Sequence, residues 1–137
     1  MNGGDNKLRL LQHSNDGQAW WQDIRTVDAV PLNQWVHVAA AMDASGLAMY
    51  INGVKQSLVQ VVGSGGGGTP ETYLGGWPFP GYIWLMRPSR TGVLTVGRTA
   101  TGTGTSFKGG LDDVMLFERI LSDAEVDSWP QSRRWSR

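Results

Sequence analysis

The alternation of apolar and polar residues is most regular between residues 35 and 58, where it predicts an antiparallel meander. Successive residues of an extended strand point to opposite faces, and this pattern predicts strands at Trp35–Met42, Leu47–Ile51 and Val54–Leu58. A turn at Asp43–Gly46 joins the first two. Asn52-Gly53 joins the last two, and this pair is the strongest short-range signal for a type I′ hairpin turn.

Further strands and one helix are predicted on either side of the meander. The strands lie at Leu8–Ser14 and Gln18–Val27, joined by the turn signal Asn15-Asp16-Gly17, then from Leu58 to Val62, at Val93–Arg98 and at Phe107–Glu118. A short helix is predicted over Leu121–Trp129. Ser122 and Glu125 have the spacing of a capping box, and Pro130 is expected to end the helix.

Because the meander is apolar on both faces, it is expected inside a sandwich of two sheets. The predicted fold class is therefore all-β, an antiparallel two-sheet β-sandwich with one short C-terminal helix. The predicted core includes Trp35, Val36, Val38, Met49, Ile51, Val96, Leu111 and Val114. The length of 137 residues predicts one domain over residues 1–137, with a basic, solvated tail at residues 131–137.

Two groups of residues in the chain resemble the signature of the laminin-G-like jelly rolls, which are relatives of the concanavalin A-like lectins and glucanases. The first group is Trp35, His37, Val38, Ala39, Asp43, Gly46 and Tyr50–Gly53; the second is Leu94–Arg98, Phe107–Val114 and Leu121–Val126. The resemblance implies a jelly roll and a non-catalytic binding module, with a glycan as its expected ligand. It also suggests an extracellular or cell-surface location.

Composition excludes several other functions. The 12 basic and 12 acidic residues cancel, so no electrostatic footprint for nucleic acid or an anionic membrane is present. The chain has no cysteine, and its first residues have neither the basic nor the apolar stretch of a signal peptide. No apolar run approaches the ~20 residues of a membrane span.

An aromatic segment at residues 73–88 is the first candidate binding site. Trp77, Phe79, Tyr82 and Trp84 are interleaved there with prolines and glycine. Two interpretations remain open, because these rings either close one end of the sandwich or form a platform on which sugar rings stack.

Carboxylates offer a second candidate but no catalytic pair. Asp112 and Glu118 share one face of their predicted strand at a separation of about 20 Å, too far for either mechanism of glycoside hydrolysis, and Asp113 faces the other way. Asp112 matches an acidic position of the resembled family, whose members often bind calcium. It is interpreted either as a calcium ligand or as a buried structural carboxylate. His37 is interpreted as a core histidine.

The resemblance also leads us to expect self-association. A full jelly roll has strands before the point that matches the start of this chain, and their absence would leave an edge open beside Phe107–Glu118. Either the aromatic segment covers this edge or a second copy does, most simply as a two-fold dimer.

Overall fold

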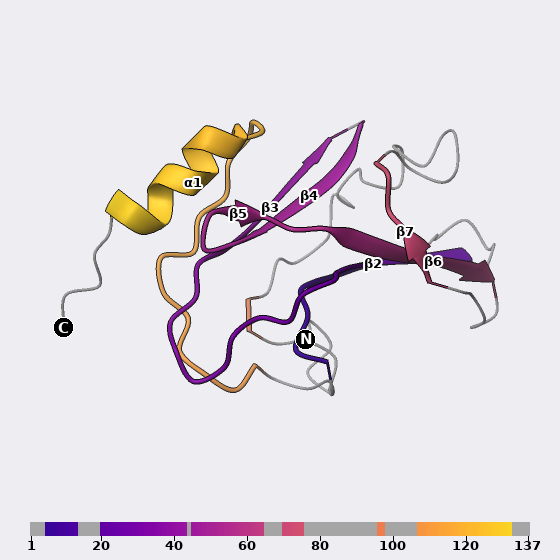
Figure 1. The fold of residues 1–137 in the computed structure, drawn as a ribbon, viewed down its shortest axis with the longest axis horizontal. Helices are drawn as coiled ribbons and strands as arrows, with labels where there is room; N and C mark the ends of the chain where they lie inside the picture. Colours follow the sequence, from indigo (N-terminus) through magenta and orange to yellow (C-terminus); the bar gives the residue numbers. More distant parts are fainter. Residues whose placement is uncertain are drawn as a thin grey trace.

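The computed structural model describes residues 5–13, 20–43, 45–64, 70–75, 96–97 and 107–132. In these residues the chain forms two antiparallel sheets and one short helix (Figure 1). The predicted fold class, a mostly β protein with two antiparallel sheets, is confirmed. The helix lies on the side of the smaller sheet that faces away from the larger one, as Figure 1 shows.

The larger sheet has the strand order β1-β2-β6-β7. Its strands are β1 (Arg9–His13), β2 (Trp20–Thr26), β6 (Leu58–Ser64) and β7 (Glu71–Thr72). The predicted pairing of the first two strands is confirmed, with Arg9 opposite Arg25. Their proposed turn at residues 15–17 lies outside the described residues.

The smaller sheet is the predicted meander, with the order β3-β4-β5. It contains β3 (Val38–Asp43), β4 (Gly46–Ile51) and β5 (Val54–Lys55). Asn52 and Gly53 have φ angles of 52° and 84°, so the turn with two positive φ angles is confirmed.

Two boundaries of the meander differ from the prediction. The first strand begins at Val38 rather than Trp35, because the His37 backbone bonds partly to a side chain: its N–H donates to Asn52 Oδ1 at 3.0 Å, and its C=O accepts from Asn52 N–H at 2.8 Å. The third strand ends at Lys55. The chain then crosses to the larger sheet, where Leu58 begins β6.

The core lies between the sheets. Ile24 and Leu58 of the larger sheet pack against Leu47 and Met49 of β4. Tyr73, which directly follows β7, belongs to the same cluster. Leu8 and Leu10 pack against this cluster from one side. Most of β4 is buried, including Tyr50 on its other face at 2% exposure.

Our prediction of the core is confirmed for Met49 and Ile51 and wrong for most of the other residues. Val36 is half-buried, whereas the exposed members are Trp35, Val38, Val96, Leu111 and Val114. Alternation gives the face on which a side chain lies but not whether that face is covered. Val38 lies opposite Ile51 in the ladder and so shares its face, yet Val38 is 47% exposed and Ile51 only 7%.

The predicted strand at Phe107–Glu118 is also wrong. These residues form no strand and are exposed along their length. A strand needs a neighbour to take up its N–H and C=O groups, and none of the described strands pairs with this segment. Val96 and Gly97 form a bend, and the rest of the predicted strand at 93–98 lies outside the described residues.

The helix α1 spans Asp123–Ser132, and its predicted capping box is confirmed. Ser122 N–H donates to Glu125 Oε2 at 2.8 Å, and Glu125 N–H donates to Ser122 Oγ at 3.3 Å. Pro130 does not end the helix as predicted, since α1 continues to Ser132. The φ that proline fixes, about −65°, is compatible with a helix. Among the described residues no helix has the length and apolarity needed to cross a membrane.

The hairpin tip and the helix are in direct contact. A Cβ added to Gly53 would lie 2.9 Å from the Cα of Asp127, closer than real contacts allow. The small turn residue therefore fixes how closely α1 approaches the smaller sheet.

We predict that Gly53→Ala lowers the free energy of unfolding by about 1–3 kcal/mol, because it adds backbone strain at positive φ and a clash with α1. Chemical denaturation measures this loss. Gly75→Ala is the matched control, since Gly75 has a φ of 93° but its added Cβ would meet only Ser45 O, at 3.8 Å. Equal losses of unfolding free energy in the two variants would show that the contact with α1 contributes nothing to the effect.

Candidate functional site

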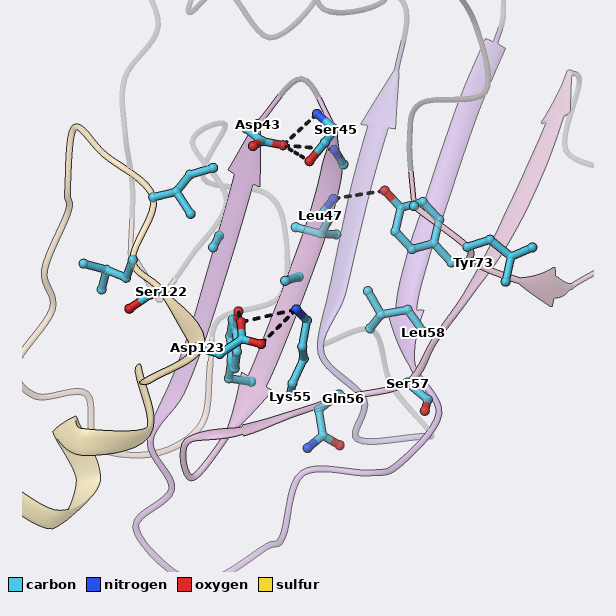
Figure 2. Close-up of a pocket in the computed structure, with 18 of the residues that line it drawn as sticks. Asp43, Ser45, Leu47, Lys55, Gln56, Ser57, Leu58, Tyr73, Ser122 and Asp123 are labelled. Atoms are coloured by element: carbon cyan, nitrogen blue, oxygen red, sulfur yellow. Dashed lines mark hydrogen bonds and ion pairs between the residues drawn. The ribbon is translucent and has the colours of Figure 1, made fainter. Parts of the chain in front are cut away.

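A hollow of about 570 Å³ lies along the edge of β4. Because β5 pairs only with Tyr50 and Ile51, the edge from Gly46 to Ala48 is left without a β5 partner. Figure 2 shows this space bounded by β3 and β4, the start of β6, the residues around Tyr73 and the start of α1.

An aspartate turn forms one end of the hollow. Asp43 Oδ1 accepts hydrogen bonds from Ser45 N–H at 2.7 Å, from Ser45 Oγ at 2.5 Å and from Gly46 N–H at 3.2 Å. These bonds, led by the one from the Ser45 hydroxyl, lower the pKa of Asp43. The carboxylate is therefore charged and held in place by the turn.

A three-residue polar group forms the wall of the hollow nearest to α1. The Tyr50 hydroxyl donates to Asp123 Oδ1 at 2.6 Å, and Lys55 Nζ lies 3.2 Å from both oxygens of the same carboxylate (Figure 2). Burial, followed by the bond to Asp123 and its charge, raises the pKa of Tyr50 to about 12. The bonds from Tyr50 and then Lys55 lower the pKa of Asp123.

Tyr73 closes the open edge of β4. Its hydroxyl accepts the Leu47 N–H at 3.0 Å, in the place where a longer β5 would have supplied a carbonyl. Burial is the main cause that raises the pKa of Tyr73, against a smaller lowering by this bond. Between these polar groups the lining is apolar and includes Ala41, Ala48, Leu58 and Leu74.

The arrangement therefore combines fixed polar groups with an apolar floor. It offers two ionised carboxylates, an ammonium group and hydroxyls around an apolar surface. Such a site can bind a small polar ligand through several hydrogen bonds.

A family model matches residues 1–87 of the chain, and its description is the concanavalin A-like lectin/glucanases superfamily. The match covers more than half of the 137 residues. The chain belongs to this superfamily. The matched span contains β1 to β7 and most of the hollow, but it ends before the second group of signature residues, which begins at Leu94.

A search of curated proteins gave no match. Among solved structures, the chain is similar to that of an S-layer domain-containing protein from Clostridium thermocellum ATCC 27405, with 13% sequence identity and a TM-score of 0.41. The similarity covers 93% of this chain and 64% of the other, so the chain spans less than two thirds of that structure.

The residues that sequence reasoning selected do not form this hollow. Trp77, Phe79, Tyr82 and Trp84 lie outside the described residues. The wall formed by Tyr50, Lys55 and Asp123 was missed. Asp123 is 73 positions from Tyr50 and 68 positions from Lys55 in the sequence, so no local pattern connects them. The one local signal was Asp123, an acidic residue in the first turn of a predicted helix.

The described residues around Asp112 do not fit a calcium site. Asp112 is exposed, not buried, and its Oδ1 accepts the N–H of Asp113 at 2.8 Å. Calcium takes six to eight oxygen ligands, usually with several carboxylates. No group of three or more potential metal-ligating side chains occurs in the part of the chain that the structure describes.

His37 is half-buried beside the meander rather than inside the core. Its Nδ1 is enclosed and has no hydrogen-bond partner among the described residues. Burial lowers the pKa of this imidazole below 6.5, because the charged form would lose its hydration.

We predict that Tyr50→Phe lowers the free energy of unfolding by about 1 kcal/mol at pH 7. The value is at the low end for a bond to a charged group because Asp123 is largely exposed to solvent. The folded-state pKa of Asp123 is below 3.8, so the difference between Tyr50→Phe and the parent should shrink as the pH falls through that pKa. Denaturation of both proteins across this range measures the effect. In an Asp123→Asn background Tyr50→Phe should cost less; an unchanged cost would contradict the role of this bond.

We also predict that acidification below pH 6.5 weakens the fold through His37. Because its pKa is lower in the folded state, the unfolded chain binds more protons as the pH falls from 6.5 to that lower value. Thermal melts of the parent and of His37→Gln over this window test it. The variant should show the flatter dependence on pH, and parallel curves would exclude His37 as the cause.

Proposed function

We propose that the chain is a non-catalytic recognition module that binds a carbohydrate in the hollow beside β4. The observation that carries the proposal is the ring of fixed polar groups around an apolar floor. The volume of about 570 Å³ lies in the range of small-ligand sites and can hold one or two sugar units. Membership of a superfamily that includes lectins supports this choice.

The chemistry of the lining suits a sugar. Hydroxyl groups both donate and accept, so a carboxylate such as Asp123 and a cation such as Lys55 can both bind one sugar through adjacent hydroxyls. These two groups already hold each other in place, so less side-chain conformational entropy is lost when a ligand binds. The C–H face of the ring would lie on the alanine and leucine floor.

The same carboxylates argue against catalysis. Hydrolysis of a glycoside needs one carboxyl group with a raised pKa as the acid, and Asp43 and Asp123 both have lowered values. Asp43 lies opposite Gly46 in the ladder, and Asp123 bonds to Tyr50, four residues further along β4. Four residues of strand correspond to about 13 Å, beyond the separation of either kind of catalytic pair.

The aromatic residues Trp77, Phe79, Tyr82 and Trp84 would supply a surface on which the sugar stacks. The support is their place in the sequence, since Trp77 follows by two residues Gly75, which lines the hollow. An extracellular or cell-surface location fits this function and rests on the family resemblance.

The alternative function, a structural domain that acts through self-association, rests on a different surface, the outer edge of β3.

We predict that a glycan array identifies ligands of the intact chain and that calorimetry with the strongest one locates the site. Asp123→Asn and Lys55→Gln should each weaken binding about tenfold, because each removes charge-assisted hydrogen bonds to the sugar. Trp77→Ala or Trp84→Ala should weaken it by roughly 1–3 kcal/mol, by analogy with bases stacked on aromatic rings, with little change in stability.

Asp28→Asn is the matched control, since Asp28 is an exposed carboxylate that does not line the hollow. This variant should bind like the parent. An array without any bound glycan, or equal binding by the parent and the Asp123 and Lys55 variants, would overturn the proposal. Loss of melting temperature in the tryptophan variants would favour their role in packing.

A further inference from the structure

The outer edge of β3 presents unpaired backbone groups in a regular order. His37 C=O accepts from Asn52 N–H, so in this ladder residues 37, 39 and 41 direct their backbone groups toward β4. Residues alternate, so the N–H and C=O groups of Val38, Ala40 and Met42 point away from β4. Among the described residues no strand pairs with this edge.

This edge also lacks the usual protection. Soluble proteins shield exposed strand edges with charged residues, proline or a bulge. From Val38 to Met42 the sequence is Val-Ala-Ala-Ala-Met, without charge or proline, and its ladder with β4 is continuous. A second strand can therefore approach this edge without desolvating a charge.

The side chains along the edge are apolar and open to solvent. Val38 and Met42 are 47% and 46% exposed, although their ladder partners Ile51 and Leu47 are buried on the same face. The inner face of the smaller sheet thus continues beyond the area that the larger sheet covers.

We propose that a second copy of this chain occupies the edge, with the two β3 strands paired antiparallel about a two-fold axis at Ala40. In this register Ala40 faces Ala40 of the second copy, and Val38 faces its Met42. All of these residues have outward backbone groups, so each opposed pair exchanges two hydrogen bonds, about six in total. The two exposed apolar side chains meet on one face, and two three-stranded sheets join into one.

The same register also brings polar side chains together at its ends. His37 lies opposite Asp43 of the second copy, since both are three residues from the axis at Ala40 and share one face of the strand. An imidazole and a carboxylate therefore become cross-strand neighbours at both ends of the pairing. A shift of one residue would lose this match and bring inward-facing backbone groups to the axis.

The segment Phe107–Phe117 is the other possible occupant from the described residues. It passes near the meander, since a Cβ on Gly110 would lie 2.8 Å from the Trp35 ring. It forms no backbone hydrogen bond with β3. Val38 and Met42 stay 47% and 46% exposed beside it, so the segment leaves the edge open to solvent.

Sedimentation equilibrium of the full chain at tens of micromolar tests the proposal, and we expect a reversible dimer. Ala40→Lys should weaken the dimer at least tenfold, because two like charges then meet at the axis. Ala40→Pro should weaken the dimer too, because it removes the N–H of residue 40 at the axis. This N–H points away from β4, so the ladder between β3 and β4 keeps its hydrogen bonds. Circular dichroism checks that both variants are folded.

Val54→Lys is the matched control. Val54 is an exposed apolar residue of the same sheet face, in β5 at the opposite edge, so the dimer should be unchanged. A monomeric parent, with the edge free or covered by residues 107–117, would overturn the proposal. So would a dimer of equal strength in Ala40→Lys and the parent.

Oxidation of Ala40→Cys provides a second, positive test, because the chain has no other cysteine. Opposed residues of a hydrogen-bonded pair have Cα atoms about 5.5 Å apart, within the range of a disulfide. We expect a covalent dimer from Ala40→Cys and little from Val54→Cys under the same conditions. Equal cross-linking of the two would indicate random collision and contradict the register.

Discussion

The burial of β4 on both faces is the constraint on which the rest of the structure depends. Leu47 and Met49 contact the larger sheet on one face, and Tyr50 is enclosed on the other beside α1. Ladder bonds hold β4 to β3 and β5, but only side chains connect it to β6 and the helix. Among the described residues, the two sheets and α1 thus share β4 as their common contact.

The hollow follows from the shortness of β5. With two residues in β5, the chain leaves the smaller sheet at Lys55 and enters the larger one at Leu58. This crossing ties the sheets together but leaves half of the β4 edge without a strand. The Tyr73 hydroxyl accepts the Leu47 N–H in place of a strand carbonyl. A single side chain fills less space than a strand, so the hollow remains open beside it.

Sequence reasoning succeeded where the cause is local. The Asn52-Gly53 turn and the Ser122–Glu125 capping box depend on residues at most three positions apart, and both were predicted with the residues that form them. The three hairpin pairings, β1–β2, β3–β4 and β4–β5, follow from turn signals and from alternation. The sheets could thus be anticipated without knowledge of their packing.

Burial and the candidate site depend on contacts between distant parts of the chain, and there the reasoning failed. Val38 has the same alternation as Ile51, but only the latter lies under the larger sheet. Apolar alternation in Phe107–Phe117 predicted a strand, but strand formation needs a neighbour that no local pattern supplies. The link between Tyr50 and Asp123 spans 73 positions, so no motif contains both residues.

This long separation has a kinetic consequence. The β3–β4–β5 meander closes only short loops and can form early, whereas the wall of the hollow requires Asp123 to reach Tyr50 across most of the second half of the chain. The entropy of loop closure therefore favours formation of the meander before the wall of the hollow, because the wall needs a carboxylate that α1 brings from 73 positions away.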